Sequence, residues 1–129
     1  MHKVGHSLKV LLVDDEPDTT LTLKRGLELN GFTVVAYNDP VEAIKEYKPN
    51  YYDFHVFDIR MPGMTGFDLA RQVWHKDPKA QVCFLSAFEI YEDEARKVFK
   101  DLNTRCFVRK PIVPSALASH LQAHSITMQ

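Results

Sequence analysis

The sequence predicts an α/β protein built on a doubly wound parallel sheet with helices on both faces. Short β-rich runs alternate with stretches of helical period, which gives five strand–helix units along the chain. The first run contains an uninterrupted apolar stretch at residues 10–13, which is typical of a strand covered on both faces. With 129 residues, the chain is long enough for one domain with a sizeable core.

The β-rich runs are predicted to be the strands of the sheet. They cover residues 8–13, 32–37, 53–57, 81–85 and 105–108. Each predicted strand is short. The segment between one strand and the next is long enough to cross back over the sheet. Such crossovers are right-handed, and they place the carboxyl ends of all the strands at one edge of the sheet.

The stretches between the strands have the signals of helices. They cover residues 19–30, 40–47, 90–102, a segment between the loop at 61–65 and Pro78, and a last helix from Pro114 onward. Asp18 is expected to cap the first helix, whose inward side carries Leu23 and Leu27. In the fourth helix acidic residues precede basic ones, as the helix dipole prefers.

The charge balance and the composition exclude several classes of protein. The 16 basic and 17 acidic side chains leave a net charge of -1, which does not favour binding of a nucleic-acid backbone by bulk charge. No apolar run is long enough to span a membrane, and residues 1–7 lack the apolar segment of a signal peptide. Two cysteines are too few for a disulfide-stapled secreted scaffold. We therefore expect a cytoplasmic protein.

The two cysteines are expected on neighbouring strands, buried as free thiols. In a register that pairs Ser86 with Phe107, Leu85 rather than Cys83 lies level with Cys106. A redox switch is therefore not expected.

The histidines near the two ends of the chain are not predicted to be metal ligands. His120 and His124 have the i,i+4 spacing of helical metal ligands, but no acidic partner of the His-Glu-x-x-His kind accompanies them. A solvated last helix is the better interpretation, and His2 and His6 belong to the N-terminal tail.

Polar side chains collect where the predicted strands end. They are Asp14-Asp15-Glu16, Asp58, Ser86-Ala87 and Arg109-Lys110-Pro111. Carboxylates gathered at one edge repel each other and call for a bound cation. A few hard oxygen ligands suit Mg²⁺, which keeps several waters and combines carboxylates with a phosphate. A lysine and a hydroxyl are the expected partners of the remaining phosphoryl oxygens.

With these residues, the chain resembles the response-regulator receiver domains of two-component signalling. The resemblance covers residues 8–124, between tails at 1–7 and 125–129. It rests on the acidic cluster, on Asp58-Ile59-Arg60-Met61-Pro62-Gly63-Met64-Thr65-Gly66, on Ser86-Ala87 and on Lys110-Pro111. It implies a flavodoxin-like sheet of order 2-1-3-4-5 with five helices.

The resemblance implies a chemical role for the residues at this edge. Asp58 corresponds to the phospho-accepting aspartate, and Lys110 corresponds to the lysine that pairs with the phosphoryl group. Asp15 corresponds to the direct Mg²⁺ ligand, and Asp14 to its helper, which reaches the metal through water. The backbone carbonyl of Arg60 is a further implied ligand.

The resemblance also implies a switch. Ser86 corresponds to the switch hydroxyl, and Phe107 to the switch aromatic, which is often Tyr in the family. The pair Asn103-Thr104 stands where a small Gly-Ala pair is frequent, so the loop there is expected to differ. The peptide bond between Lys110 and Pro111 is implied to be cis.

The lifetime of the phosphorylated state is implied to depend on two further side chains. In the family, the residues two beyond the phospho-acceptor and two beyond the switch hydroxyl border the approach of the hydrolytic water. These are Arg60 and Phe88. Neither side chain offers a hydrogen-bond acceptor to orient the water, so a long lifetime is expected.

The implied function is a phospho-accepting signalling switch rather than an enzyme that acts on a separate substrate. The implied partners are a sensor histidine kinase or a phosphotransfer protein, and a downstream protein that binds the face of helix four, strand five and helix five. A homodimer formed on phosphorylation is the alternative use of that face. Direct contact with nucleic acid or with a membrane is not expected.

Other functions are weaker interpretations of the same sequence. Because the chain starts at Met1 without an output domain, a stand-alone regulator is favoured over a receiver from a transcription factor or hybrid kinase. A phosphohydrolase of the haloacid-dehalogenase type needs an aspartate two residues after its nucleophile, where this chain has Arg60. A flavodoxin holds its phosphate with hydroxyls and amides, and Asp14-Asp15-Glu16 repels a phosphate that lacks a metal.

Overall fold

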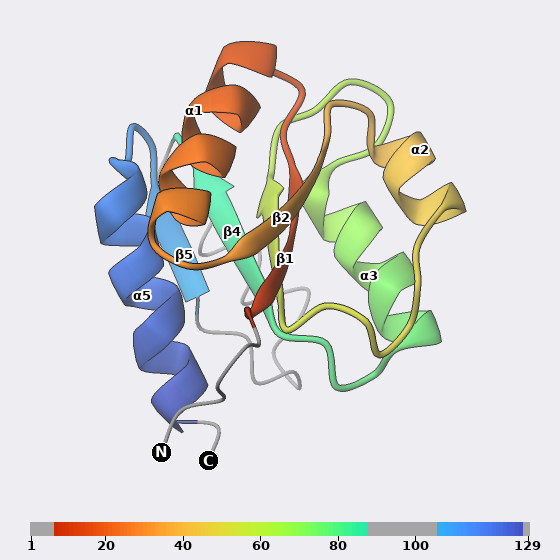
Figure 1. Cartoon of the computed structure of the whole chain (residues 1–129). Helices are drawn as coiled ribbons and strands as arrows, with labels where there is room; N and C mark the ends of the chain where they lie inside the picture. The colour runs from red at the N-terminus through yellow and green to blue at the C-terminus, as the bar shows by residue number, and fades with distance from the viewer. Residues whose placement is uncertain (1–6, 88–105, 128–129) are drawn as a thin grey trace.

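The computed structural model describes residues 7–87 and 106–127, which form three layers with a parallel sheet in the middle (Figure 1). The strands are β1 (Lys9–Val13), β2 (Thr33–Tyr37), β3 (Phe54–Asp58), β4 (Val82–Ser86) and β5 (Cys106–Arg109). The helices are α1 (Pro17–Leu29), α2 (Pro40–Lys45), α3 (Gly66–Lys76) and α5 (Pro114–Thr127). The helix expected over residues 90–102 lies outside the described residues.

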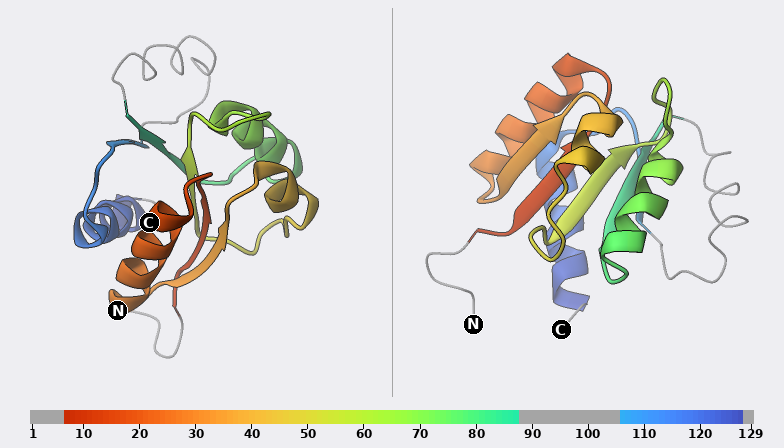
Figure 2. Two further views of the ribbon diagram at one scale, coloured as in Figure 1. Left: turned by 90° about the horizontal axis from the view of Figure 1, so that it is seen from above. Right: turned by 90° about the vertical axis from the view of Figure 1, so that its right-hand side faces the viewer.

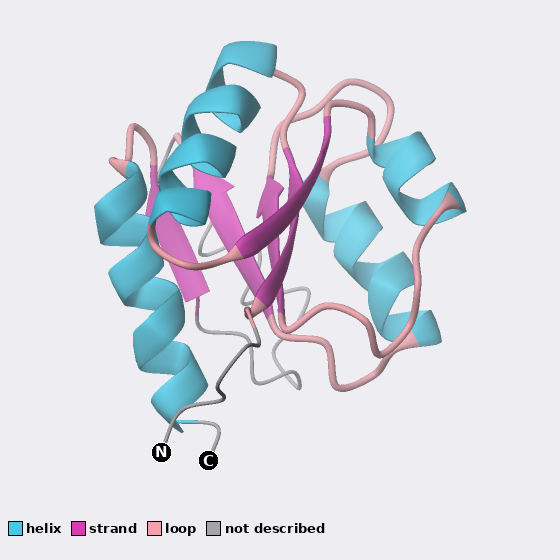
Figure 3. Ribbon diagram, in the orientation of Figure 1, coloured by secondary structure: helices cyan, strands magenta, loops and turns pink. Residues whose placement is uncertain are grey.

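The strand order is β2-β1-β3-β4-β5, and every neighbouring pair is parallel. This order confirms the predicted flavodoxin-like sheet. Helices α1 and α5 cover one face of the sheet, and α2 and α3 cover the other (Figure 2, Figure 3). The chain reverses its direction of winding between β1 and β3, so the carboxyl ends of these two strands flank the crevice where such folds place their sites.

Each face of the sheet buries its own apolar core. One core packs against α1 and α5 and includes Leu27, Leu117 and Leu121. The other packs against α2 and α3 and includes Phe57 and Phe84, both completely buried. Burial on both faces explains the consecutive apolar residues of the central strands. Within the described part of the chain, none of the helices combines the length and the apolar character needed to cross a bilayer.

Strands β3, β4 and β5 each end one residue later than the sequence indicated. Asp58, Ser86 and Arg109 are therefore the last residues of strands rather than the first residues of loops. This difference matters for the site, because strand pairing fixes the backbone that carries Asp58 and Ser86.

Two helix ends differ from the expected positions. Helix α1 begins at Pro17, and its N-cap residue is Glu16 rather than Asp18, without a side-chain cap. Proline suits the first position of a helix because it has no N–H that would be left unbonded. Helix α2 ends at Lys45, short of the expected Tyr47, whose side chain turns into the interior.

Tyr47 belongs to a buried polar network that the sequence did not reveal. Its hydroxyl lies 2.7 Å from Nε2 of His55 and 3.1 Å from Oδ2 of Asp77. Nδ1 of His55 donates to the carbonyl of Gln81 at 2.9 Å. Burial lowers the pKa of His55 to about 4, so the ring is neutral at pH 7. The network joins the α2–β3 connection to the α3–β4 connection.

The pairing of β4 with β5 contradicts the expectation for the cysteines. The register pairs Cys83 with Cys106 and Phe84 with Phe107, so the expected pairing of Ser86 with Phe107 is wrong. The two cysteines form a disulfide, and the prediction of free thiols is also wrong. The true register differs from the expected one by two residues, and such a shift keeps every side chain on the same face of the sheet. The hydrophobic pattern could therefore not distinguish the two registers.

His120 also differs from its expected exposure. It is half-buried on α5, and its Nε2 atom is shielded from solvent. Its ring lies beside the two cysteines rather than on a solvated face. The side chain of His124 lies outside the described residues.

Candidate functional site

The side chains that were predicted to converge lie together at one edge of the sheet. Asp14 and Asp15 follow β1, Asp58 ends β3, Ser86 ends β4, and Lys110 follows β5. Asp14 is completely buried, and Asp58 and Ser86 are only 5% and 4% exposed. Adjacent parallel strands bring these residues together, as the strand-end rule requires. Their chemical roles stay predictions.

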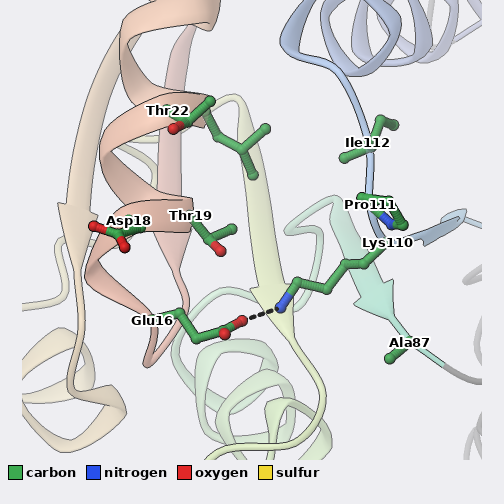
Figure 4. Close-up of a pocket in the computed structure, with 9 residues that line it drawn as sticks. Glu16, Asp18, Thr19, Thr22, Ala87, Lys110, Pro111 and Ile112 are labelled. Carbon is green, nitrogen blue, oxygen red and sulfur yellow. Dashed lines mark hydrogen bonds and ion pairs between the residues drawn. The ribbon is translucent and has the colours of Figure 1, made fainter.

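Lys110 is the cation of this site. Its Nζ atom lies 3.0 Å from Oδ2 of Asp14, 3.5 Å from Oδ1 of Asp58 and 3.1 Å from Oε1 of Glu16. Figure 4 shows the contact with Glu16, which comes from the turn before α1. Burial alone would lower the pKa of Lys110, but its hydrogen bonds to Asp14 and Glu16 outweigh this effect and raise the pKa. The lysine is therefore positively charged.

Three aspartate carboxylates lie close together at this site. Asp14, Asp15 and Asp58 each have an oxygen within 4.8 Å of the other two. Burial and the neighbouring charge of Asp14 raise the pKa of Asp58 to about 7, although Lys110 acts in the opposite direction. Burial also raises the pKa of Asp14. Both groups carry their negative charge at a cost in free energy, which a bound cation would reduce.

The donor set fits a hard divalent cation such as Mg²⁺. All three groups offer carboxylate oxygens, which are the ligands that Mg²⁺ prefers. One lysine does not balance three carboxylates, so the cluster retains negative charge for a cation to neutralise. Asp15 is the most exposed of the three, whereas Asp14 and Asp58 are buried.

Hydrogen bonds hold Asp14 in place. Its N–H donates to the carbonyl of Tyr37 at 3.2 Å, and its carbonyl accepts from the side-chain amide of Asn38 at 2.8 Å. The same amide group donates to the hydroxyl of Thr20 at 2.9 Å. Oδ1 of Asp14 accepts the N–H of Glu16 at 2.9 Å. Sequence reasoning missed Asn38, although its position after β2 makes it a strand-end residue like the others.

The segment after Asp58 is held close to the sheet by a glycine. Gly66 begins α3, and its N–H donates to the carbonyl of Ile59 at 2.9 Å. A Cβ atom at Gly66 would collide with the carbonyl group of Asp58. The absence of a side chain therefore lets α3 begin directly against the end of β3.

The implied switch residues lie on β4 and β5. The carbonyl of Ser86 accepts the backbone N–H of Lys110 at 2.8 Å, which joins the switch position to the lysine. Phe107 is partly buried, and its ring stacks on Phe84 with 5.5 Å between the ring centroids. The peptide bond between Lys110 and Pro111 is cis, which confirms the expectation.

The structure describes only one of the two residues that are implied to set the lifetime of the phosphorylated state. Arg60 follows β3 and is exposed. Phe88 and the helix-four part of the implied partner face lie outside the described residues.

A pocket of about 510 Å³ adjoins the acidic site, between α1 and the segment after β5 (Figure 4). It is lined by Glu16, Asp18, Thr19, Thr22, Leu23, Ala87, Lys110, Pro111 and Ile112. The pocket combines aliphatic side chains with the ammonium group of Lys110, so a molecule that enters it comes close to the cation of the site.

Comparisons with known proteins agree with this geometry. Residues 10–122 match the family described as the response regulator receiver domain. The chain is 31% identical over 120 residues to the sensor protein EvgS of Escherichia coli K12, and 32% identical over 117 residues to the transcriptional regulatory protein PrrA of Mycobacterium tuberculosis. These matches cover 92% and 91% of the chain, but only 10% of EvgS and 49% of PrrA. The chain thus spans at most about half the length of these relatives.

Solved structures show the same fold. The HemR receiver domain of Leptospira biflexa superimposes with a TM-score of 0.79 at 30% identity, covering 91% of this chain and 93% of that one. A receiver domain from Clostridium thermocellum superimposes with a TM-score of 0.78 at 23% identity, covering 95% and 99%. The family match, the sheet order and the residues gathered at the strand ends lead to one conclusion: the chain belongs to the response regulator receiver domain family.

Proposed function

We propose that Asp58 accepts a phosphoryl group from the phosphohistidine of a sensor histidine kinase or a phosphotransfer protein. The observation that carries this proposal is the buried carboxylate of Asp58 with the ammonium group of Lys110 3.5 Å away. A carboxylate in this position is an oxygen nucleophile, and the lysine is a fixed positive charge beside the phosphoryl group it would receive.

In the proposed transfer, an oxygen of Asp58 attacks phosphorus while the bond between phosphorus and the histidine nitrogen breaks. With the second ring nitrogen of the phosphohistidine protonated, the products are an aspartyl phosphate and the neutral imidazole of the donor. Lys110 pairs with the phosphoryl oxygens, and the Ser86 hydroxyl donates to another of them. Mg²⁺, held by Asp14, Asp15, Asp58 and the Arg60 carbonyl, would supply further charge neutralisation when bound.

The pocket beside Lys110 supports an approach of the donor from the α1 side. Its aliphatic lining, including Leu23, Pro111 and Ile112, gives an apolar surface next to the site. Lys110 lines this pocket, and its side chain is 17% exposed. The donor protein would cover this surface while its phosphohistidine meets Asp58.

Phosphorylation is tested by intact-mass measurement after treatment with acetyl phosphate or phosphoramidate in Mg²⁺. The wild type is expected to gain one phosphoryl group, and Asp58→Asn is expected to gain none. Asp15→Asn should lose Mg²⁺ binding and phosphorylation together, because it removes a ligand rather than the acceptor. The exposed Asp18, on the same edge, provides the matched control: Asp18→Asn should be phosphorylated like the wild type.

Two results of this experiment would contradict the proposal. Phosphorylation of Asp58→Asn at the wild-type level would place the acceptor elsewhere. Normal Mg²⁺-dependent phosphorylation of Asp15→Asn would show that the metal ligands are wrongly assigned.

We further propose that the phosphoryl group draws the Ser86 hydroxyl toward it and that Phe107 then turns inward. The stacking of Phe107 on Phe84 gives the aromatic ring a defined starting position. The movement would alter the surface around β5 and α5, where a downstream protein or a second copy would bind. The test is amide chemical shifts with and without phosphorylation. Changes at Phe107 and Leu117 are expected, and changes confined to the surroundings of Asp58 would contradict the switch.

The lifetime of the phosphorylated state is proposed to depend on Arg60 and Phe88. Neither side chain accepts a hydrogen bond, so neither orients a water for attack on phosphorus. A side chain that restores about 1.4 kcal/mol of water positioning would speed hydrolysis roughly tenfold. The measurement is the first-order dephosphorylation rate in saturating Mg²⁺. Phe88→Glu and Arg60→Asn are both expected to be faster than the wild type; decay that is unchanged or slower in both would refute the assignment.

The proposed cellular role is phosphorelay signalling, with the chain acting as a switch in the cytoplasm. EvgS and PrrA are a sensor protein and a transcriptional regulatory protein, so receivers of this sequence type occur in both settings. The native reading frame would show whether this receiver stands alone or belongs to a larger regulator.

A further inference from the structure

A second cluster of metal-ligating side chains lies apart from the acidic site. The sulfur atoms of Cys83 and Cys106 and a ring nitrogen of His120 lie within 4.8 Å of one another. In the structure the two sulfurs form a disulfide. We propose that, once this disulfide is reduced, the three side chains bind one zinc-type divalent metal ion.

Regular secondary structure holds all three donors. Cys83 and Cys106 are directly paired on β4 and β5, with their Cα atoms 4.5 Å apart. His120 approaches from α5, where it is flanked along the helix by Leu117 and Leu121. Both leucines belong to the same buried core as the two cysteines. The contact between α5 and the sheet therefore fixes the imidazole near the sulfurs.

The spacing of the donors suits a tetrahedral ion. Bonds of about 2.3 Å from zinc to sulfur and about 2.0–2.1 Å to nitrogen place two ligands of one ion about 3.5–3.8 Å apart. The three donor atoms already lie within 4.8 Å of one another. After the sulfur–sulfur bond is broken, we infer that rotation of the three side chains brings the donor atoms to these distances.

Charge and burial select the kind of ion. Cys83 and Cys106 are 3% and 6% exposed, so a net charge at this site would be costly. Two thiolates, one neutral imidazole and one divalent ion give a net charge of zero, whereas a monovalent ion would leave one negative charge. Sulfur and nitrogen donors prefer zinc-type ions to Mg²⁺, so this site and the acidic site would bind different metals.

Conversion of the disulfide form into the metal-bound form needs a dithiol reductant and releases protons. The reductant gives two electrons and two protons to the disulfide, which forms two cysteine thiols while the reductant becomes a disulfide. The metal ion then replaces the two thiol protons, and two metal–sulfur bonds form. Because each sulfur is used either in the disulfide or on the metal, the oxidised protein has no such site.

The test uses Co²⁺ as an optical probe for zinc, with the full chain and without oxygen. Reduced protein is expected to bind one Co²⁺ with a thiolate-to-cobalt charge-transfer absorption, which Zn²⁺ then removes. Oxidised protein is expected to show no such absorption. His120→Asn should weaken binding by at least about tenfold, since even partners that only orient a ligand contribute about 10- to 100-fold. The exposed His75 provides the control, and His75→Asn should bind like the wild type.

Reduced wild type without this absorption would overturn the proposal, and so would His120→Asn with unchanged affinity and spectrum. Since variants at these buried positions could fold poorly, X-ray absorption of the reduced, zinc-loaded wild type gives an independent answer. Two sulfur ligands are expected, and a first shell of oxygen and nitrogen alone would overturn the proposal. The charge-transfer band arises only from sulfur, so Co²⁺ bound by the acidic site does not produce it. Neither the Co²⁺ absorption nor the X-ray absorption involves phosphorylation, so the results of both are independent of the proposed function.

Discussion

The contact of one lysine with a crowded set of carboxylates is the constraint on which the rest of the structure depends. Lys110 lies within 3.5 Å of both Asp14 and Asp58, and Asp15 completes a cluster that one positive charge does not neutralise. Such a cluster is stable only if rigid elements hold its members against their mutual repulsion. The ends of β1 and β3 and the start of the segment after β5 provide these elements.

Several features of the fold act to keep that cluster in place. The side-chain amide of Asn38, just after β2, donates to the carbonyl of Asp14 and to the hydroxyl of Thr20 on α1. Gly66 allows α3 to pack against the carbonyl of Asp58. On the opposite side of the site, the backbone of Lys110 is bonded to the carbonyl of Ser86. The residues that carry the proposed chemistry are thus supported by every strand of the sheet.

The sequence predicted the features that depend on pattern and topology, and it failed where several arrangements share one pattern. Alternating strands and helices indicated the parallel sheet, and the strand-end rule then identified Asp14, Asp58 and Lys110 without any side-chain geometry. The β4–β5 register was wrong because a two-residue shift leaves the buried face unchanged, and the error hid the disulfide. A buried polar residue such as His55 has no periodic signal, because only its partners in three dimensions make its burial favourable.

The central claim is that burial and mutual repulsion make Asp58 a destabilised carboxylate that a cation relieves. The most direct test follows the side-chain carboxyl carbon shift of Asp58 by NMR as a function of pH. Without Mg²⁺ the expected pKa of Asp58 is about 7, above the ordinary value of 3.8. Between these two pH values the folded protein keeps a proton that the unfolded chain has lost. The stability of the folded protein therefore falls as the pH rises from 3.8 to about 7. Saturating Mg²⁺ competes with this proton and should lower the apparent pKa. A pKa near 3.8 that does not respond to Mg²⁺ would contradict the account.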